Sequence, residues 1–117
     1  MNNCSESTLR KLLNTFGIAY RARQTFTGQD KIFEAIRCSI DLDVFVTDDV
    51  SVNVMRKLKA AEERGSVSIF ILYGTDRKML GRALGINETQ VTALPRDSGF
   101  SQKILQLLND DRSDANE

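Results

Sequence analysis

The segment from Arg21 to Arg37 gathers side chains of the types that bind nucleic acids. Its sequence, RARQTFTGQDKIFEAIR, places arginines, threonines, a glycine, an amide and a lysine at a predicted strand-to-helix junction. Backbone N–H groups at the start of a helix suit phosphate oxygens, while Gln29, Asp30 and Lys31 could reach base edges or sugars. Composition alone leaves two interpretations open: a junction that binds RNA or DNA, or a capped helix with ordinary surface charges.

Asp48 and Asp49 offer a second possible chemistry, because they follow an apolar segment that is predicted to be a buried strand. Carboxylates at the carboxyl end of an α/β sheet often hold magnesium or take part in phosphoryl transfer. A phosphate-accepting receiver domain would need its acidic pair nearer the N-terminus and a further Asp after a later strand. The strand VSIFILYG ends without one. The alternative is that both carboxylates belong to the loop before a helix capped by Ser51.

Other site chemistries lack the residues that they require. The chain contains no histidine, which excludes a Ser-His-Asp triad and imidazole metal ligands. Cys4 and Cys38 are too few for a four-thiolate zinc site, and we expect two free thiols rather than a disulfide. No glycine-rich nucleotide-binding motif follows a strand. We therefore expect no enzyme activity, no cofactor and no metal.

Charge is balanced over the whole chain but not along it. Sixteen basic residues oppose sixteen acidic ones, while residues 1–40 carry six basic against three acidic side chains, a net of +3. Residues 110–117 carry one basic against four acidic side chains, a net of −3. We recognise no signal peptide and no apolar run near the roughly 20 residues that a membrane span needs. The expected location is cytoplasmic, with no membrane partner.

Hydrophobic spacing predicts five helices that alternate with four strands. Four of the expected helix starts offer a residue that can cap or begin a helix. These are Ser5, Ser7 or Thr8 for the first, Ser51 for the third, Thr75 for the fourth, and Ser98 or Ser101 for the fifth, while the second helix is expected after Gly28. The expected strands are residues 24–27, 42–47, 67–73 and 91–94.

The two central strands are apolar on both faces, so helices must cover both sides of the sheet. This predicts an α/β fold, a three-layer α/β/α sandwich with a four-stranded mixed sheet and about five helices, in which the order of the strands stays open. We expect one domain over residues 1–109 and an acidic disordered tail over residues 110–117.

The order of these elements resembles the L-seven-Ae family of ribosomal proteins, within the kink-turn RNA-binding superfamily, and in particular its small bacterial ribosomal-protein-like branch. The resemblance covers roughly residues 9–108. It rests on five segments in the expected order: GIAYRAR, TGQDKIFEAIR, LDVFVTDDVS, MLGRALG and RDSGFSQKIL. It implies an α/β/α sandwich and RNA as a partner.

Kink-turn binders of this family typically carry G-x-N-E-x-x-K at the start of the second helix. Here Gly28 matches the glycine, Asp30 takes the asparagine place, and Lys31 and Glu34 take the glutamate and lysine places with reversed charge. Lys31 and Glu34 stand three residues apart on a helix and can pair with each other. The resemblance also implies RNA contact through residues 86–91.

The predicted function is RNA binding without catalysis, in a protein of ribosomal type whose kink-turn recognition is altered or weakened. The expected partners are structured RNA and ribosomal or assembly proteins. The alternative is a protein-interaction or ribosome-assembly accessory module that has lost RNA recognition. The expected RNA-binding residues are Arg21, Arg23, Thr27, Gly28, Gln29, Asp30, Lys31, Glu34 and Arg37.

Overall fold

A computed structural model describes residues 5–115 of the chain, with side chains up to residue 110. The helices are α1 (Glu6–Arg21), α2 (Gln29–Arg37), α3 (Val52–Glu63), α4 (Arg77–Leu84) and α5 (Gly99–Ala115). The strands are β1 (Phe26–Thr27), β2 (Leu42–Thr47), β3 (Val67–Leu72) and β4 (Val91–Pro95). None of the described helices is both long and apolar enough to cross a membrane.

The strands form one mixed sheet in the order β1-β4-β2-β3. β2 and β3 run parallel, with Val44 opposite Ile69. β4 is antiparallel to both of its neighbours, with Ala93 opposite Val44 on β2 and Phe26 on β1. The last strand in the chain therefore lies between the first two, and the prediction of a four-stranded mixed sheet is confirmed.

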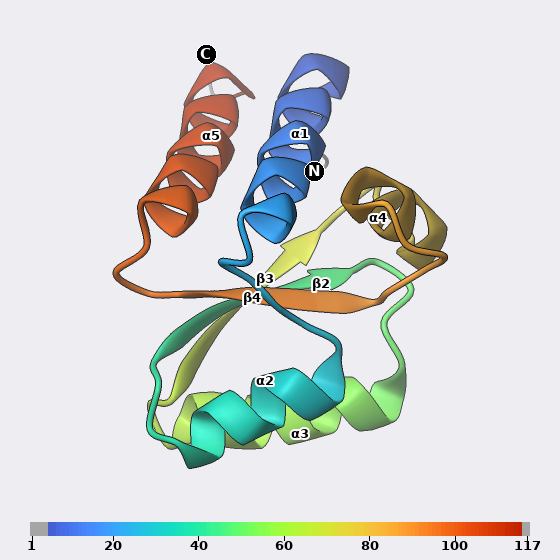
Figure 1. The fold of residues 1–117 in the computed structure, drawn as a ribbon. Coiled ribbons are helices and arrows are strands. Elements are labelled where there is room, and N and C mark those ends of the chain that lie inside the picture. Colours follow the sequence, from blue (N-terminus) through green and yellow to red (C-terminus); the bar gives the residue numbers. More distant parts are fainter. Residues whose placement is uncertain (1–4, 116–117) are drawn as a thin grey trace.

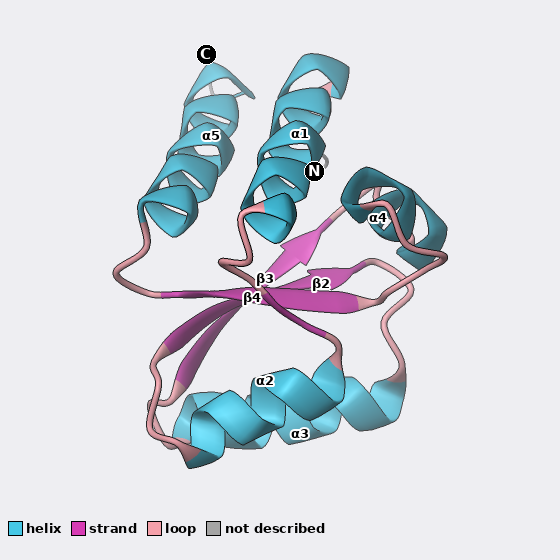
Figure 2. Ribbon diagram, in the orientation of Figure 1, coloured by secondary structure: helices cyan, strands magenta, loops and turns pink. Residues whose placement is uncertain are grey.

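Helices cover both faces of this sheet. Figures 1 and 2 show α1, α4 and α5 on one face and α2 and α3 on the other. Alternate side chains of a strand point to opposite faces, so β2 contributes to both layers. Val44 and Val46 are buried in the core shared with α2 and α3. Phe45 packs against Phe16 and Phe70, with ring centroids 5.1 Å and 5.4 Å away. The predicted three-layer α/β/α sandwich is confirmed.

The helices α1 and α4 approach each other closely at Gly17. A Cβ atom at this position would lie 2.6 Å from the Ala83 carbonyl oxygen. Any larger residue would therefore push the two helices apart. Glycine weakens a helix in isolation, and the structure shows that its lack of a side chain is what allows this contact.

The start of α4 differs by one residue from the prediction. Thr75 is buried, and its main-chain carbonyl oxygen accepts the Asp48 N–H at 2.9 Å, so it belongs to the turn after β3. Asp76 caps the helix instead, because its carboxylate accepts the Met79 N–H at 2.8 Å. The predicted cap at Thr75 is wrong.

The helix α5 begins at Gly99, where the Ser98 hydroxyl oxygen accepts the Phe100 N–H at 3.1 Å. Ser101 is buried and its hydroxyl donates to the Asp43 carboxylate. Residues 110–115 are helical where the sequence suggested a disordered tail, because a helix that has already formed adds residues at little cost. Residues 116 and 117 lie outside the described part, so the division into a domain and a tail stays a prediction.

Candidate nucleic-acid interface

Gly28 precedes α2 and provides no side-chain cap. Its φ of 92° and ψ of 151° lie in a region that is nearly restricted to glycine. Its N–H donates to the Val91 carbonyl oxygen at 3.1 Å, and its carbonyl oxygen accepts the Ile32 N–H at 3.2 Å. Apart from Gly28 and its two chain neighbours, no atom lies within 4 Å of the point where a Cβ would stand. The backbone at the start of α2 is therefore open to a ligand.

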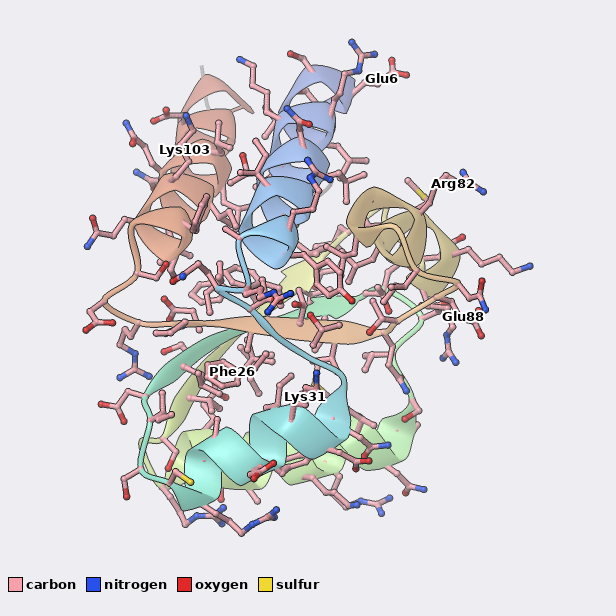
Figure 3. The ribbon with its side chains drawn as sticks, viewed as in Figure 1. Glu6, Phe26, Lys31, Arg82, Glu88 and Lys103 are labelled. Carbon is pink, nitrogen blue, oxygen red and sulfur yellow. The ribbon has the colours of Figure 1, made fainter. Side chains whose placement is uncertain are left out.

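Three N–H donors lie in the first turn of α2, on Gln29, Asp30 and Lys31. Within the described part of the chain, no acceptor forms a hydrogen bond with them. The helix dipole adds partial positive charge at the same place. The side chains of these three residues are exposed, and Figure 3 shows Lys31 at this end of α2. The first turn of α2 thus combines open N–H groups with an ammonium group, which suits phosphate oxygens.

The charged side chains further along α2 do not pair with one another. Lys31 and Glu34 are both exposed, and the ion pair expected between them does not form in the described structure. Arg37 is in the last turn of α2, about 12 Å along the axis from Gln29 at 1.5 Å per residue. Arg37 therefore lies at the opposite end of the helix from Gly28.

The loop of residues 86–90 lies beside the start of α2, because Gly28 is hydrogen bonded to Val91. Gln90 fixes the loop to β2 and α3: its carbonyl oxygen accepts the Thr47 N–H at 3.0 Å, and its side-chain oxygen accepts the Ser51 N–H at 2.6 Å. The family resemblance indicates this loop as an RNA contact. The sequence does not predict the anchoring by Gln90, because this bond joins residues 39 positions apart.

Gly81 of α4 determines how closely this loop can approach the helix. A Cβ at Gly81 would lie 2.4 Å from the Glu88 Cα and 2.8 Å from the Asn87 carbonyl oxygen. The loop backbone therefore packs directly on the backbone of α4. Together with Gln90, this contact gives the loop a fixed position next to α2.

Thr27 has a structural contact that the sequence did not reveal. Its hydroxyl lies 3.0 Å from the Thr25 hydroxyl and 2.9 Å from that of Thr92. Thr92 is buried and stands opposite Thr27 in the pairing of β1 with β4. The Thr27 hydroxyl thus helps to join the short β1 to the sheet.

Arg21 is the last residue of α1, which covers the other face of the sheet from α2, and Arg23 follows in the turn that ends this helix. Arg23 has a φ of 61°, which is unusual for a residue with a side chain. Its N–H donates to the Tyr20 carbonyl oxygen at 3.0 Å, and the Gln24 N–H donates to that of Ala19 at 2.9 Å. This pair of bonds is a Schellman motif. The predicted residues therefore do not form one cluster, and only Gly28 to Lys31 share the start of α2.

Asp48 and Asp49 stabilise the turn before α4. The Asp48 carboxylate accepts the Gly74 N–H at 3.1 Å. Asp49 accepts the Arg77 N–H at 3.1 Å and forms an ion pair with the Arg77 guanidinium at 3.3 Å. Burial works to raise the pKa of Asp49, but hydrogen bonding with Thr47 and the charge and N–H of Arg77 outweigh it and lower the pKa below 3.8. Both carboxylates thus have structural hydrogen bonds.

Comparison with known proteins shows which family the chain belongs to, which the geometry of the site does not show. No protein-family model matches the chain. RNA-binding protein YlxQ of Bacillus subtilis (strain 168) is 30% identical to it over 93 residues, which covers 80% of this chain and 90% of that protein. The chain belongs to the YlxQ family. A second YlxQ, the RNA-binding protein of Enterococcus faecium, is 28% identical over 110 residues, or 89% of this chain and 97% of that protein.

Solved structures show how far the YlxQ-family fold extends. A protein of unknown function from Bacillus halodurans C has a TM-score of 0.72 and 31% identity, and the match covers 85% of this chain and 97% of that one. The Giardia lamblia 15.5kD RNA binding protein has a TM-score of 0.68 at 16% identity, and covers 97% of this chain and 94% of its own. At that identity the second likeness concerns the fold alone.

Proposed function

We propose that this YlxQ-family chain is a non-catalytic RNA-binding protein of ribosomal type and a member of the L-seven-Ae superfamily. Its interface is the start of α2 together with residues 86–90. The observation that carries the proposal is the set of open N–H groups after Gly28, directly beside that loop. The names of the two YlxQ relatives, both RNA-binding proteins, support it.

Each part of this interface has a separate role in binding. The N–H groups of Gln29, Asp30 and Lys31 donate to phosphate oxygens, which fixes the position of the RNA. The Asp30 carboxylate accepts hydrogen bonds from base N–H groups, and the Lys31 ammonium donates to phosphates or to base acceptors. Residues 86–90 supply further polar contacts at the edge of the site.

We infer that kink-turn reading is weakened relative to the family pattern. An ammonium at Lys31 cannot accept the guanine N–H groups of sheared G·A pairs, and the exposed carboxylate of Glu34 repels phosphate. No ion pair between the two neutralises these charges in the described structure. If each lost contact costs ~1–3 kcal/mol, the two together reduce affinity roughly 30-fold to more than 10⁴-fold.

A titration with matched RNAs and a charge-swapped variant tests this proposal. The natural protein, Lys31→Glu/Glu34→Lys and a control swap, Lys59→Glu/Glu63→Lys on α3, are titrated against a kink-turn RNA and a G·A mutant at two salt concentrations. We expect weak, salt-dependent binding of both RNAs by the natural protein, and strong preference for the kink-turn only in the α2 variant. Absence of RNA binding at both salt concentrations would contradict RNA binding itself.

A groove on α3 favours a second candidate function, as a protein-interaction or ribosome-assembly module. It has a volume of about 600 Å³ and is lined by Val50, Val52, Met55, Arg56, Lys59, Ala60 and Glu63. Val52 is 72% exposed, unusually so for a large apolar side chain. If the module depends on this groove, Val52→Glu should lose protein partners from nuclease-treated lysate and keep its RNA affinity. If Val52→Glu keeps both its RNA affinity and all the protein partners of the natural chain, the protein-interaction function of this groove is excluded.

A further inference from the structure

Four exposed basic side chains lie on α1 and α4, the two helices that meet at Gly17. Arg10 and Arg21 lie on the same face of α1 as Gly17, at positions i, i+7 and i+11 counted from Arg10. Lys78 and Arg82 lie one turn apart on the exposed stripe of α4. We name these four residues the α1–α4 seam.

The geometry at Gly17 places one of these side chains at the helix contact itself. The Nη1 atom of Arg21 lies 3.3 Å from the point where a Gly17 Cβ would stand, and the Ala83 carbonyl oxygen lies 2.6 Å from the same point. The Arg21 guanidinium is therefore next to α4, and Ala83 is the direct neighbour of Arg82. The close approach of the two helices brings the charge of Arg21 next to α4, and Arg82 carries a second charge on the outer side of that helix.

The seam carries charge that the protein does not neutralise. All four side chains are exposed, and none of them forms an ion pair within the described structure. Glu6 is the only acidic residue within α1 or α4, and it lies one turn before Arg10. Arg77, the remaining basic residue of α4, is paired with Asp49. Figure 3 shows Arg82 on the outer side of α4 and Lys103 beyond α1, on α5.

Both helices of the seam lead directly into the interface at α2. The backbone of Gly81, adjacent to Arg82, packs on residues 87 and 88, and that loop continues to Val91, which is bonded to Gly28. The end of α1 reaches the same glycine through the short segment that contains β1. RNA that lies across the start of α2 and the loop can therefore continue onto α4.

We propose that the α1–α4 seam is a second RNA contact surface, which binds phosphates of RNA that flanks the part held at α2. This proposal rests on the proposed function. Arginine and lysine on rigid helices bind phosphate oxygens without reading bases, so the seam adds affinity and salt dependence but no sequence preference.

The test replaces two charges of the seam by neutral side chains of similar helix propensity, Arg21→Gln with Arg82→Gln. The control, Arg64→Gln with Lys103→Gln, removes the same net charge from exposed positions directly after α3 and on α5. Each protein is titrated with the kink-turn RNA, extended by a duplex flank, and with its G·A mutant between 50 and 200 mM salt. Circular dichroism melting verifies that all variants are folded.

We expect the seam variant to lose the same factor of affinity for both RNAs, and the slope of log affinity against log salt to fall by about 1.5–2. The affinity deficit then shrinks about tenfold between 50 and 200 mM salt. A deficit equal to that of the control variant would overturn the seam proposal and leave the proposed function intact. A deficit for the kink-turn RNA alone would also overturn it, since it would mean base reading. If the natural protein binds neither RNA, both proposals fail.

Discussion

Three helices begin at the same end of the sheet, and only one of them begins without a side-chain cap (Figure 1). At α3, the Ser51 hydroxyl accepts the Val54 N–H at 3.3 Å. At α4, Asp76 accepts the Met79 N–H and Asp49 accepts the Arg77 N–H. At α2, Gly28 offers nothing to the donors that follow it.

The contrast shows where this fold leaves helix donors unpaired. A cap such as Ser or Asp stabilises a protein by about 0.5–2 kcal/mol relative to Ala but by only a few tenths of a kcal/mol relative to Gly, and α3 and α4 use one. α2 instead leaves all three of its first-turn N–H donors without an acceptor in the described structure. Neither of the other two starts does so, which is why we propose the start of α2, rather than that of α3 or α4, as the phosphate site.

The largest effect is expected from Gly28→Ala. A side chain at a φ of 92° and ψ of 151° is strained, and we expect a loss of about 1–3 kcal/mol in the free energy of unfolding. Because the first turn of α2 must shift, RNA affinity should fall about tenfold or more. Urea denaturation and RNA titration measure the two losses. Gly99→Ala, at a position with open space and no positive φ, should change neither appreciably.

Ser51→Ala opens a closed helix start and completes the comparison. It removes the bond to the Val54 N–H, which should cost about 1 kcal/mol of stability. RNA affinity should stay within about twofold, because the N–H of residue 51 still holds Gln90. If Ser51→Ala loses as much RNA affinity as Gly28→Ala, the uncapped start of α2 and the capped start of α3 do not differ in RNA binding.

The C-terminal ends of the helices also differ in the residue that adopts a positive φ. α3 and α4 end with glycine at positive φ, Gly65 and Gly85, whereas α1 and α2 place Arg23 and Ser39 there, at φ values of 61° and 64°. Replacement of either by glycine should raise stability, by up to about 1 kcal/mol. If Arg23 contacts RNA, only Arg23→Gly should lower the RNA affinity and make that affinity less dependent on salt, while Ser39→Gly should change neither. Equal behaviour of the two variants would remove Arg23 from the interface.

The smallest effect is expected for the stability that Asp49 gives to the start of α4, which depends on pH. Asp49 has a lowered pKa in the folded protein, so its carboxylate contributes stability above the pKa of the unfolded chain, near 3.8, and loses it as pH falls through the lower folded value. Asp49→Asn should reduce stability at pH 7 and make unfolding less sensitive to pH below about 4. Urea midpoints at pH 7, 4 and 3 measure this. A variant that loses as much stability between pH 4 and 3 as the natural protein would refute the assignment.

The layers of the fold were predictable because they follow from burial. LDVFVT is apolar on both faces, which requires helices on both sides of the strand, and in the structure α2 and α3 lie opposite α1, α4 and α5. The strand order was not predictable, because β4 pairs with β2 across a long stretch of chain. A strand pattern indicates which residues are buried and leaves the partner undetermined.

The candidate site was predictable only in part, because the sequence shows which residues are adjacent in the chain and not which ones the fold brings together. The start of α2 could be recognised because Gly28 and the polar residues after it are adjacent in sequence. Arg37 shares that segment, yet the rise of the helix carries it away from Gly28. The anchoring of residues 86–90 depends on Gln90 and Ser51, and only the tertiary fold brings this pair together.

The packing of α1 has a consequence for the order of events during synthesis. The buried side chains of this helix, Leu12, Phe16 and Ala19, belong to a core that also includes residues of α4 and α5, so some of the packing partners of α1 are made long after it. At about 5–20 residues per second, several seconds pass between the completion of α1 and that of α5. During this interval its apolar stripe is exposed in the nascent chain, and it is there that a chaperone would act.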